Sequence, residues 1–345
     1  MDHLPFLTDA PGIGGRLKVQ PEDFAVDEVP LYEACGEGEF LYLRIRKRDI
    51  SATELTSHFA RVLGISQSAI GVAGRKDRRA VTTQYVSVPA RSVDDSSKLN
   101  TDQIEVLESK LHRNKLKTGH LASNRFEIVL RDVDISDATE LRRIVETTSE
   151  AIGRLGFLNY YGEQRFGRDD DTDSDGFRLL RGEHVRRLGK NALRFALSAA
   201  QSRMFNDWVA ERASDGLTHV VLPGDVMQVV GSGGCFVVED AAAEQARFDK
   251  RETVLTGPIF GPKMRQPAGE PATREAAILH RFGLTPDAFQ RFRKLTSGTR
   301  RPLLVWPGDF AAEVIDGGVR LSFTLPSGSY ATALLREFTK QEPES

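Results

Sequence analysis

Apolar and polar residues alternate with a period of two along several stretches of the N-terminal half. The clearest stretch has an apolar side, formed by Leu41, Leu43 and Ile45, and a polar side, formed by Tyr42, Arg44 and Arg46. This period is typical of a β-strand that buries one face, so we expect a strand here with a basic outer face. Similar runs predict further strands over residues 81–88, 104–111 and 125–130.

Two helices are predicted by the residues that would begin them. Ser51-Ala52-Thr53-Glu54 and Asp137-Ala138-Thr139-Glu140 both resemble a capping box, in which the first and fourth residues satisfy free backbone N–H groups. Apolar residues follow each box at spacings of three and four, and Gly64 is a plausible end for the first helix. Strands accompanied by helices on one side indicate the α+β fold class.

The residue composition of the chain changes after Gly156. An aromatic and polar segment, residues 157–167, is followed by an acidic run over residues 169–175. We expect a domain junction here. The acidic run lacks the ligand spacing and the terminal glutamate of an EF-hand, so we interpret it as a solvated loop and expect no metal site.

Beyond this junction, helical and strand patterns resume. Apolar residues that recur at helical spacing, and that we therefore expect in the core, are Leu193, Leu197, Ala200, Met204 and Trp208. Residues 226–230 and 235–238 predict a hairpin, residues 267–271 a loop, and residues 310–315 and 319–325 two strands joined at 316–318. A last helix is expected over residues 329–340.

The composition is that of a folded globular protein. The chain has 345 residues, 40% hydrophobic and 28% charged, which suggests about two domains. Cys35 and Cys235 lie far apart and outside any Cys/His cluster, so neither a disulfide framework nor a structural zinc site is expected. The start of the chain has no export signal and no stretch is apolar enough to span a membrane. A cytoplasmic protein without a membrane partner is therefore expected.

Positive charges are clustered although the net charge is −2. Five groups stand out: residues 44–48, 75–79, 110–125, 178–194 and 291–301. If these groups shared one face, they would form a track for the phosphates of a nucleic acid. Surface charge scattered around the molecule is an equally good interpretation of the pattern alone.

The loop over residues 71–84 contains the most suggestive chemistry. Its single carboxylate, Asp77, stands among Arg75, Lys76, Arg78 and Arg79, and Gly71 and Gly74 allow turn conformations before the next strand. Such a setting suits a reactive carboxylate beside a polyanionic substrate. A solvated basic turn with one balancing charge explains the same residues.

Asp77 belongs to a series of motifs spread over nearly the whole chain. In chain order they are Lys18-Val19-Gln20-Pro21-Glu22-Asp23-Phe24, Gly74-x-Lys76-Asp77-x-x-Ala80-Val81-Thr82-x-Gln84, Asn124-Arg125-Phe126, residues 159–167, Leu197-Ser198-Ala199-Ala200 with Phe205-Asn206, and Leu325-Pro326-x-Gly328-Ser329-Tyr330-Ala331-Thr332. Together they resemble the TruD family of tRNA pseudouridine synthases, and the second resembles the signature that contains the family's catalytic aspartate. Tyr161 and Tyr330 stand where phenylalanine is common in that family.

The resemblance implies a particular architecture. A pseudouridine-synthase catalytic domain with a mixed central sheet would comprise residues 1–158 and 302–345. An inserted α/β domain specific to the family would comprise residues 159–301. The cleft between the two domains would receive the RNA.

The resemblance also implies an activity, the isomerisation of uridine to pseudouridine in tRNA, at position 13 in bacterial members. Asp77 would be the catalytic residue, acting without a metal or another cofactor. Phe24, Phe126 and Tyr330 would surround the flipped base, and Asn124 would hold the uracil edge or orient Asp77. The supporting residues would be Lys18, which pairs with Asp77 and keeps it ionised, and Lys76.

Two other classes of function remain open from the sequence. A non-enzymatic RNA-binding module would keep the fold and the basic groups without turnover. A phosphotransfer enzyme would use the glycine-containing loop, although neither a complete P-loop nor paired metal carboxylates are present. The sequence indicates tRNA as the partner and no obligate protein partner. It leaves open the tRNAs used, the oligomeric state, and whether Asp77 attacks C1′ or removes the C2′ proton.

Overall fold

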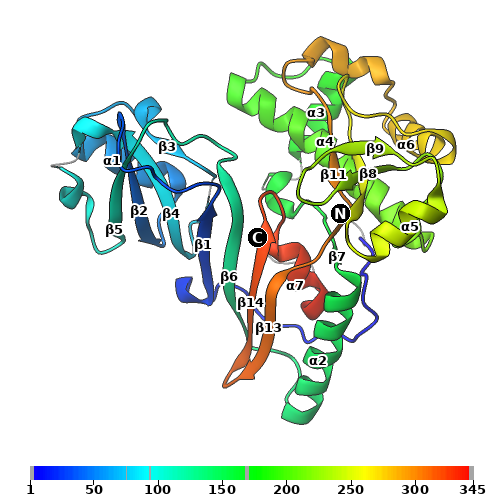
Figure 1. Cartoon of the computed structure of the whole chain (residues 1–345), viewed down its shortest axis with the longest axis horizontal. Helices are drawn as coiled ribbons and strands as arrows, with labels where there is room; N and C mark the ends of the chain where they lie inside the picture. Colours follow the sequence, from blue (N-terminus) through cyan, green and yellow to red (C-terminus); the bar gives the residue numbers. More distant parts are fainter. Residues whose placement is uncertain (1–3, 75, 93–94, 168–170, 342–345) are drawn as a thin grey trace.

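The computed structural model describes residues 4–74, 76–92, 95–167 and 171–341, and it has two lobes (Figure 1). One lobe is built on an eight-stranded sheet and the other on a four-stranded sheet. The first and last described segments lie side by side, because Arg336 donates to the Leu4 carbonyl and Lys340 to the Thr8 carbonyl.

The eight-stranded sheet is mixed, as predicted. Its strands are β1 (Phe24–Pro30), β2 (Phe40–Arg48), β3 (Gly71–Val72), β4 (Val81–Pro89), β5 (Ile104–His112), β6 (Leu121–Arg131), β13 (Gly308–Ile315) and β14 (Gly318–Pro326). They follow the order β13-β14-β6-β1-β4-β2-β5, with β3 beside β4. The β1–β4 pair is parallel and the other pairs are antiparallel. The central strands alternate buried and exposed residues, which places the core on one face.

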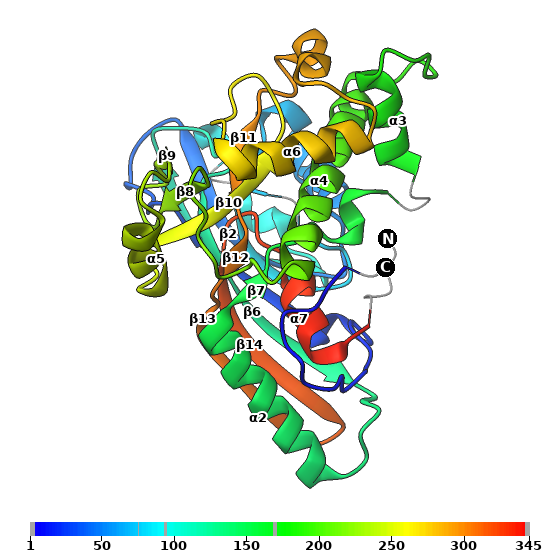
Figure 2. The ribbon, with the colours of Figure 1, turned by 90° about the vertical axis from the view of Figure 1, so that its right-hand side faces the viewer.

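Three helices pack on this sheet: α1 (Ala52–Val62), α2 (Ala138–Leu155) and α7 (Ala331–Thr339). The predicted capping box begins α1, with Ser51 accepting from the Glu54 N–H and Glu54 accepting from the Ser51 N–H. The Asp137 side chain caps α2 by accepting from the N–H of Thr139. Figure 2 shows α2 running along the long strands, while α7 is almost wholly buried near the second lobe.

The second lobe has the sheet order β11-β10-β8-β9, formed by β8 (Val226–Val229), β9 (Cys235–Val237), β10 (Thr253–Ile259) and β11 (Thr299–Pro302). Its helices are α3 (Asp171–Leu180), α4 (Lys190–Ser214), α5 (Ala241–Asp249) and α6 (Gly269–Arg281). Short 3₁₀ turns are η1 (Pro21–Asp23), η2 (Gln67–Ala69), η3 (Ala90–Ser92), η4 (Ser96–Leu99), η5 (Glu163–Arg165) and η6 (Pro286–Phe292). The apolar stripe predicted for the core lies on α4, where Leu197 and Met204 are fully buried.

The chain passes between the two sheets through a two-stranded pair. β7 (Phe157–Leu158) pairs with β12 (Leu304–Val305), and the Asn159 N–H donates to the Leu303 carbonyl. This position agrees with the expected insertion of residues 159–301, called the inserted region below. The α+β class is confirmed, and the division into two domains at these residues stays a prediction.

The structure corrects three local predictions. The acidic run was expected to form a loop, but α3 begins at Asp171, because carboxylates are favourable in the first turn of a helix; Asp169 and Asp170 lie outside the described residues. The expected loop over residues 267–271 already contains the start of α6 at Gly269. Tyr42, expected on an outer face, is buried, because Leu116 in the segment before β6 and Leu121 at the start of β6 pack with it.

Candidate active site

Asp77 lies in the loop between β3 and β4, and its carboxylate is paired. The Lys18 Nζ lies 2.6 Å from Asp77 Oδ2, so the ion pair expected from the sequence is present. The Asp77 side chain keeps 32% of its surface exposed and that of Lys18 keeps 20%. The pair is therefore ordered by its surroundings and still accessible from solvent.

The backbone of Lys18 helps to aim its side chain. Lys18 has φ = 54°, in the left-handed region that residues with a Cβ seldom occupy. Its ammonium lies 4.4 Å from the centroid of the Phe24 ring, a cation–π distance. A strained backbone and an aromatic support together point Lys18 at Asp77, and strain of this kind is concentrated at functional sites.

A second lysine, Lys47, holds the backbone of the Asp77 loop, and the sequence reasoning missed it. Its side chain is fully buried, and its Nζ donates to the carbonyls of Asp77, at 2.6 Å, and Ile50, at 2.7 Å. Burial lowers the pKa of Lys47 to about 8, and the nearby charge of Asp77 partly opposes that shift. The alternation along the strand could have revealed it, because Lys47 falls on the same side of β2 as the buried Leu43 and Ile45.

Gly71 has a different role from the one expected. It has no positive φ, but a Cβ at this position would lie 2.3 Å from the Leu116 carbonyl oxygen. Gly71 is therefore needed for close backbone approach and not for a turn. The loop is anchored further by the Asp49 N–H, which donates to the carbonyl of Ala80.

Lys76 does not bind Asp77, its neighbour in the chain; it binds Glu28 and Asn124. Its Nζ lies 2.7 Å from Glu28 Oε1 and 2.7 Å from Asn124 Oδ1, and both Lys76 and Glu28 side chains are almost buried. Lys76 and Asp77 are neighbours in the chain, yet their side chains bind different groups, Glu28 and Asn124 for Lys76 and Lys18 for Asp77. The Asn124 amide oxygen is thereby occupied by Lys76.

The register of the sheet brings these polar residues together. Glu28 on β1 is directly opposite Asn124 on β6, and Asn124 is opposite Leu325 on β14. The other oxygen of Glu28 accepts from the Tyr85 N–H on β4. Residues from four strands thus meet at one end of the sheet, beside the Asp77 loop.

The predicted aromatic residues fall into two groups. Phe24 and Phe126 meet edge to face, with centroids 6.2 Å apart, and Phe126 stacks on Phe323. Both Phe24 and Phe126 are buried, so only a small part of each ring is accessible.

Tyr330, at the N-cap of α7, belongs to the second group. Its ring contacts Tyr161 and lies 5.9 Å from the guanidinium of Arg301, and burial raises the Tyr330 pKa. Within the described residues, no contact joins Tyr330 to Asp77. Arg301 gave no signal of its own in the sequence beyond membership of a basic group.

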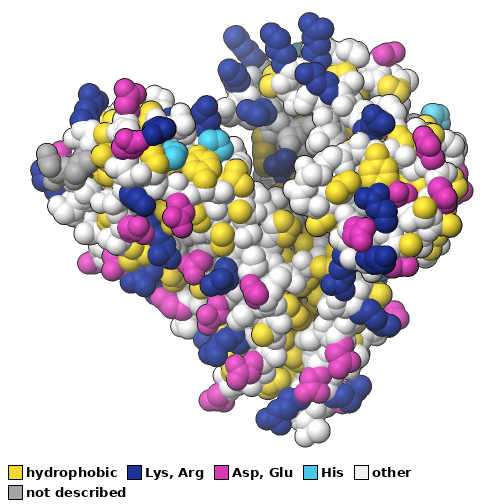
Figure 3. Space-filling view, in the orientation of Figure 1, with side chains coloured by type: hydrophobic (Ala, Val, Ile, Leu, Met, Phe, Trp, Pro, Cys, Tyr) yellow, Lys and Arg dark blue, Asp and Glu magenta, His cyan; other side chains and the backbone are white. Residues whose placement is uncertain are grey.

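The basic groups do not form one uniform track. Lys47, Arg300 and Arg301 are buried, and Arg46 and Arg48 are paired with Glu105 and Glu22. Exposed cations are instead concentrated near α3, α4 and η6: Arg186, Arg187, Lys190, Arg194, Arg291, Arg293 and Lys294. Figure 3 shows Lys and Arg side chains gathered over this part of the second lobe, above a hollow between the lobes. Arg75 lies outside the described residues.

Two classes of site have no candidate in the described part of the chain. None of its helices combines the length and the apolar character that a membrane span requires. Among the described residues, no group of three or more His, Cys, Asp or Glu side chains is placed to hold a metal ion.

The sequence is similar to known proteins of one family over nearly its full length. The family model described as tRNA pseudouridine synthase D (TruD) matches residues 1–186 and 181–338. The chain is 41% identical to tRNA pseudouridine synthase D of Anaeromyxobacter dehalogenans, over all of this chain and 98% of that protein. It is 40% identical to the Thermus thermophilus protein of the same name, over 99% of this chain and 93% of that one.

A solved structure assigned to TruD of Methanosarcina mazei is also similar. It has a TM-score of 0.78 and 26% identity, with 98% of this chain and 96% of that chain covered. A mixed sheet carrying one paired, accessible carboxylate, with these relatives, places the chain among the tRNA pseudouridine synthases. Within that class it belongs to the tRNA pseudouridine synthase D (TruD) family.

Proposed function

We propose that the protein isomerises uridine to pseudouridine at position 13 of tRNA, with Asp77 as the catalytic residue and without a cofactor. The observation that carries the proposal is the Asp77 arrangement: Lys18 binds the carboxylate and Lys47 binds the backbone of the same residue. Membership of the family supports the reaction class.

The chemistry explains why one carboxylate is enough. The reaction breaks the bond between C1′ and uracil N1 and forms a bond between C1′ and uracil C5, with no net change in oxidation state. Asp77 acts on the ribose, either by attacking C1′ or by removing the C2′ proton. Lys18 fixes the direction of the carboxylate in both routes, and the proton on C5 leaves when the new bond has formed.

The uracil must leave the stacked arm of the tRNA to reach Asp77. Flipping a base costs a few kcal/mol, which contacts in the pocket must offset. We assign this role to Phe24, Phe126 and Tyr330, since stacking on an aromatic side chain contributes roughly 1–3 kcal/mol per base. The amide N–H groups of Asn124 are available for the uracil edge, because its oxygen is bound to Lys76.

Because Phe24 and Phe126 are buried and Tyr330 lies apart from them, a stacked base requires the pocket to open. We propose that RNA binding separates the two lobes at the hollow and gives the uracil access to these rings. The substrate is tRNA, and a cytoplasmic location is part of the same proposal.

Tritium release from tRNA labelled at uracil C5 tests the proposal. The protein should release tritium, and Asp77→Asn should release none while still binding tRNA. Asp27 provides the control, because it is an exposed carboxylate on the other face of β1; Asp27→Asn should retain turnover. Mapping of pseudouridine in the product should find it at position 13. Undiminished turnover by Asp77→Asn would remove the catalytic assignment.

A further inference from the structure

Arg301, on β11, is a buried cation whose partners are all neutral. Its guanidinium donates to the Asn159 carbonyl at 3.1 Å, to Asn159 Oδ1 at 2.7 Å and to the Gly328 carbonyl at 2.9 Å. Only 9% of the residue is exposed, and the guanidinium lies 4.1 Å from the centroid of the Tyr161 ring. Burial lowers the pKa of Arg301, so its environment opposes the positive charge.

The preceding residue, Arg300, is a buried arginine whose charge is balanced by a carboxylate. Arg300 points to the opposite side of β11 and binds Glu275 through two hydrogen bonds of 3.0 and 2.7 Å. Arg300 and Glu275 are both buried. Within the described residues, Arg301 has no carboxylate at salt-bridge distance.

A second arginine, Arg165, lies beside the same ring. Its guanidinium is 5.4 Å from the centroid of Tyr161 and bonds to the hydroxyls of Ser202, at 3.1 Å, and Ser198. These bonds use Nε and Nη2, and Nη1 makes no hydrogen bond to a described residue. The positive charge of Arg165 contributes to the lowered pKa of Arg301, which is consistent with their proximity.

Two guanidinium groups around one aromatic ring, with no described carboxylate between them, form a site that is electrostatically incomplete. A buried charge is costly unless an opposite charge accompanies it. Arginine's planar donors suit a phosphate group particularly well. We propose that Arg165 and Arg301 bind one phosphodiester group of the substrate RNA.

The position of the site fits a phosphate close to the flipped nucleotide. Tyr330, assigned above to the base pocket, contacts Tyr161, and a Cβ on Gly162 would lie 3.6 Å from the Tyr330 ring. Tyr161, Gly162, Arg165 and Tyr330 are all partly exposed, so the site can be reached from solvent. This inference rests on the proposed function, which identifies the RNA as tRNA. It adds that the group bound by the two arginines is the phosphodiester next to the target uridine.

A phosphate-neutralising substitution in the RNA tests the contact directly. tRNA is assembled with a single 2′-deoxy methylphosphonate linkage, placed in turn at each position of the D arm, with the matched 2′-deoxy phosphate as its reference. Binding is measured by filter retention with full-length Asp77→Asn protein, in which turnover is blocked. At one linkage next to uridine 13, neutralisation should weaken binding about 10-fold, as for loss of a charge-assisted hydrogen bond.

The variant Arg165→Gln should bind unmodified tRNA about 10-fold more weakly. At the sensitive linkage, neutralisation should weaken binding of this variant by clearly less than about 10-fold, because Arg165 is already missing and only Arg301 still contacts that phosphate. Its salt dependence should fall by about one unit in the slope of log affinity against log salt. Arg165 is used because it is partly exposed, whereas a substitution of Arg301 also removes buried contacts.

Arg203→Gln is the matched control. Arg203 is also a partly exposed arginine, on α4, but it is paired with Asp207 and Asp173. It should bind like the parent and lose about 10-fold at the same linkage. The proposal is overturned if Arg165→Gln binds as tightly as the parent or if no linkage is sensitive. It is also overturned if neutralising the linkage weakens binding of Arg165→Gln by the same factor as it weakens binding of the parent. Binding is read without turnover, so failure of tritium release would reject the isomerase proposal and leave this contact to be judged separately.

Discussion

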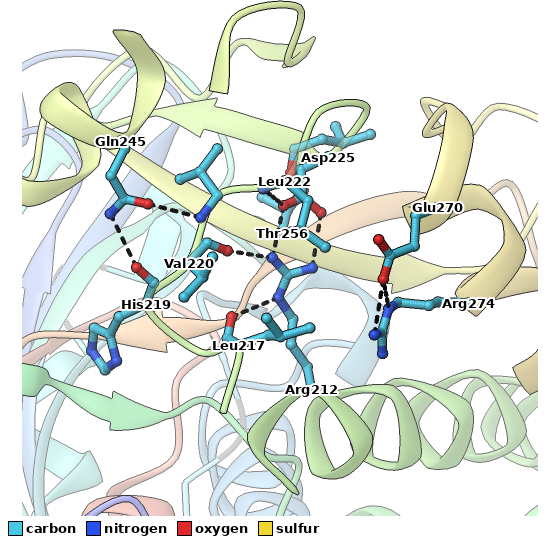
Figure 4. A network of polar contacts seen from close by, with 12 residues as sticks. Arg212, Leu217, His219, Val220, Leu222, Asp225, Gln245, Thr256, Glu270 and Arg274 are labelled. Carbon is cyan, nitrogen blue, oxygen red and sulfur yellow. Dashed lines mark hydrogen bonds and ion pairs between the residues drawn. The ribbon is translucent and has the colours of Figure 1, made fainter. Parts of the chain in front are cut away.

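Two sites in the molecule hold charged side chains in opposite ways. In the inserted region, Arg212 binds Asp225 through hydrogen bonds of 2.8 and 2.7 Å and also donates to the carbonyls of Leu217 and Val220 (Figure 4). Both charged side chains are at most 4% exposed. Every charge there has an internal partner, so nothing remains for a ligand.

The Asp77 site is left open by comparison. Lys18 and Asp77 make one contact of 2.6 Å, and both remain partly exposed. The loop is held through its backbone by Lys47, and among the described residues no hydrogen bond is made to the second carboxylate oxygen of Asp77. The difference teaches that a closed ion pair leaves no charge for a ligand and cannot lose one partner without a large cost, whereas an open pair on an anchored loop is suited to chemistry. Substitutions should therefore separate stability from turnover.

The largest effect is expected at the open pair. Asp77→Asn should lower turnover by at least about 10⁴-fold, because the group that acts on the ribose is lost. The melting temperature should stay within a few degrees, since the side chain is partly exposed and makes a single ion pair. Single-turnover assays and thermal denaturation measure the two quantities. A large fall in melting temperature would show that Asp77 is also structural and weaken the comparison.

The closed pairs should give the reverse result. Glu275→Gln leaves Arg300 buried without its counter-charge, so the free energy of unfolding should fall by about 3–5 kcal/mol. Turnover by the folded fraction should change little. Denaturant unfolding measures the loss, and Glu270→Gln, on the exposed face of the same helix, is the control that should unfold like the parent.

Lys18 lies between these extremes. Lys18→Gln should lower turnover by about 10²-fold, because the direction of the Asp77 carboxylate is no longer fixed. Its effect on stability should stay below about 1 kcal/mol, as for other partly exposed ion pairs. Lys18→Arg should recover part of the turnover. Equal loss by both variants would indicate that position, and not charge, is what matters.

Lys47 should give the smallest effect, visible as a pH dependence. Its folded-state pKa is about 8 and its ordinary value is 10.5, so between these values the unfolded chain holds more protons. Stability should therefore rise with pH over this window, by at most about 1.4 kcal/mol per unit. The difference in unfolding free energy between the parent and Lys47→Met should grow from pH 8 to pH 10. Lys263→Met, at an exposed lysine, should show no such growth.

The sequence predicted much of the fold because the signals are local. The capping box at Ser51 and the strand alternation around Leu43 depend on neighbours a few residues away. The pairing of Lys18 with Asp77 was predicted only through the family resemblance, since 59 residues separate them. Local reasoning therefore identifies the elements, and motifs were needed to join them.

The rest of the site depends on information that neighbouring residues do not carry. Lys76 was grouped with Asp77 by adjacency, yet it reaches Glu28 and Asn124 because the strand register places them on its side. Arg300 and Arg301 look alike in the sequence and differ only in which side of β11 they face. Whether a cation is compensated is decided by the fold and not by its neighbours in the chain.

The pairing of β6 with β14 has a consequence for synthesis of the protein. Leu130 on β6 is opposite Val319 on β14, so the whole inserted region is synthesised between the two strands. Until Pro326 has been synthesised, one edge of β6 lacks its partner, and an unpaired edge invites aggregation. The large sheet therefore cannot be completed until the inserted region has been synthesised, and a nascent chain that stops before residue 318 exposes this edge for as long as it persists.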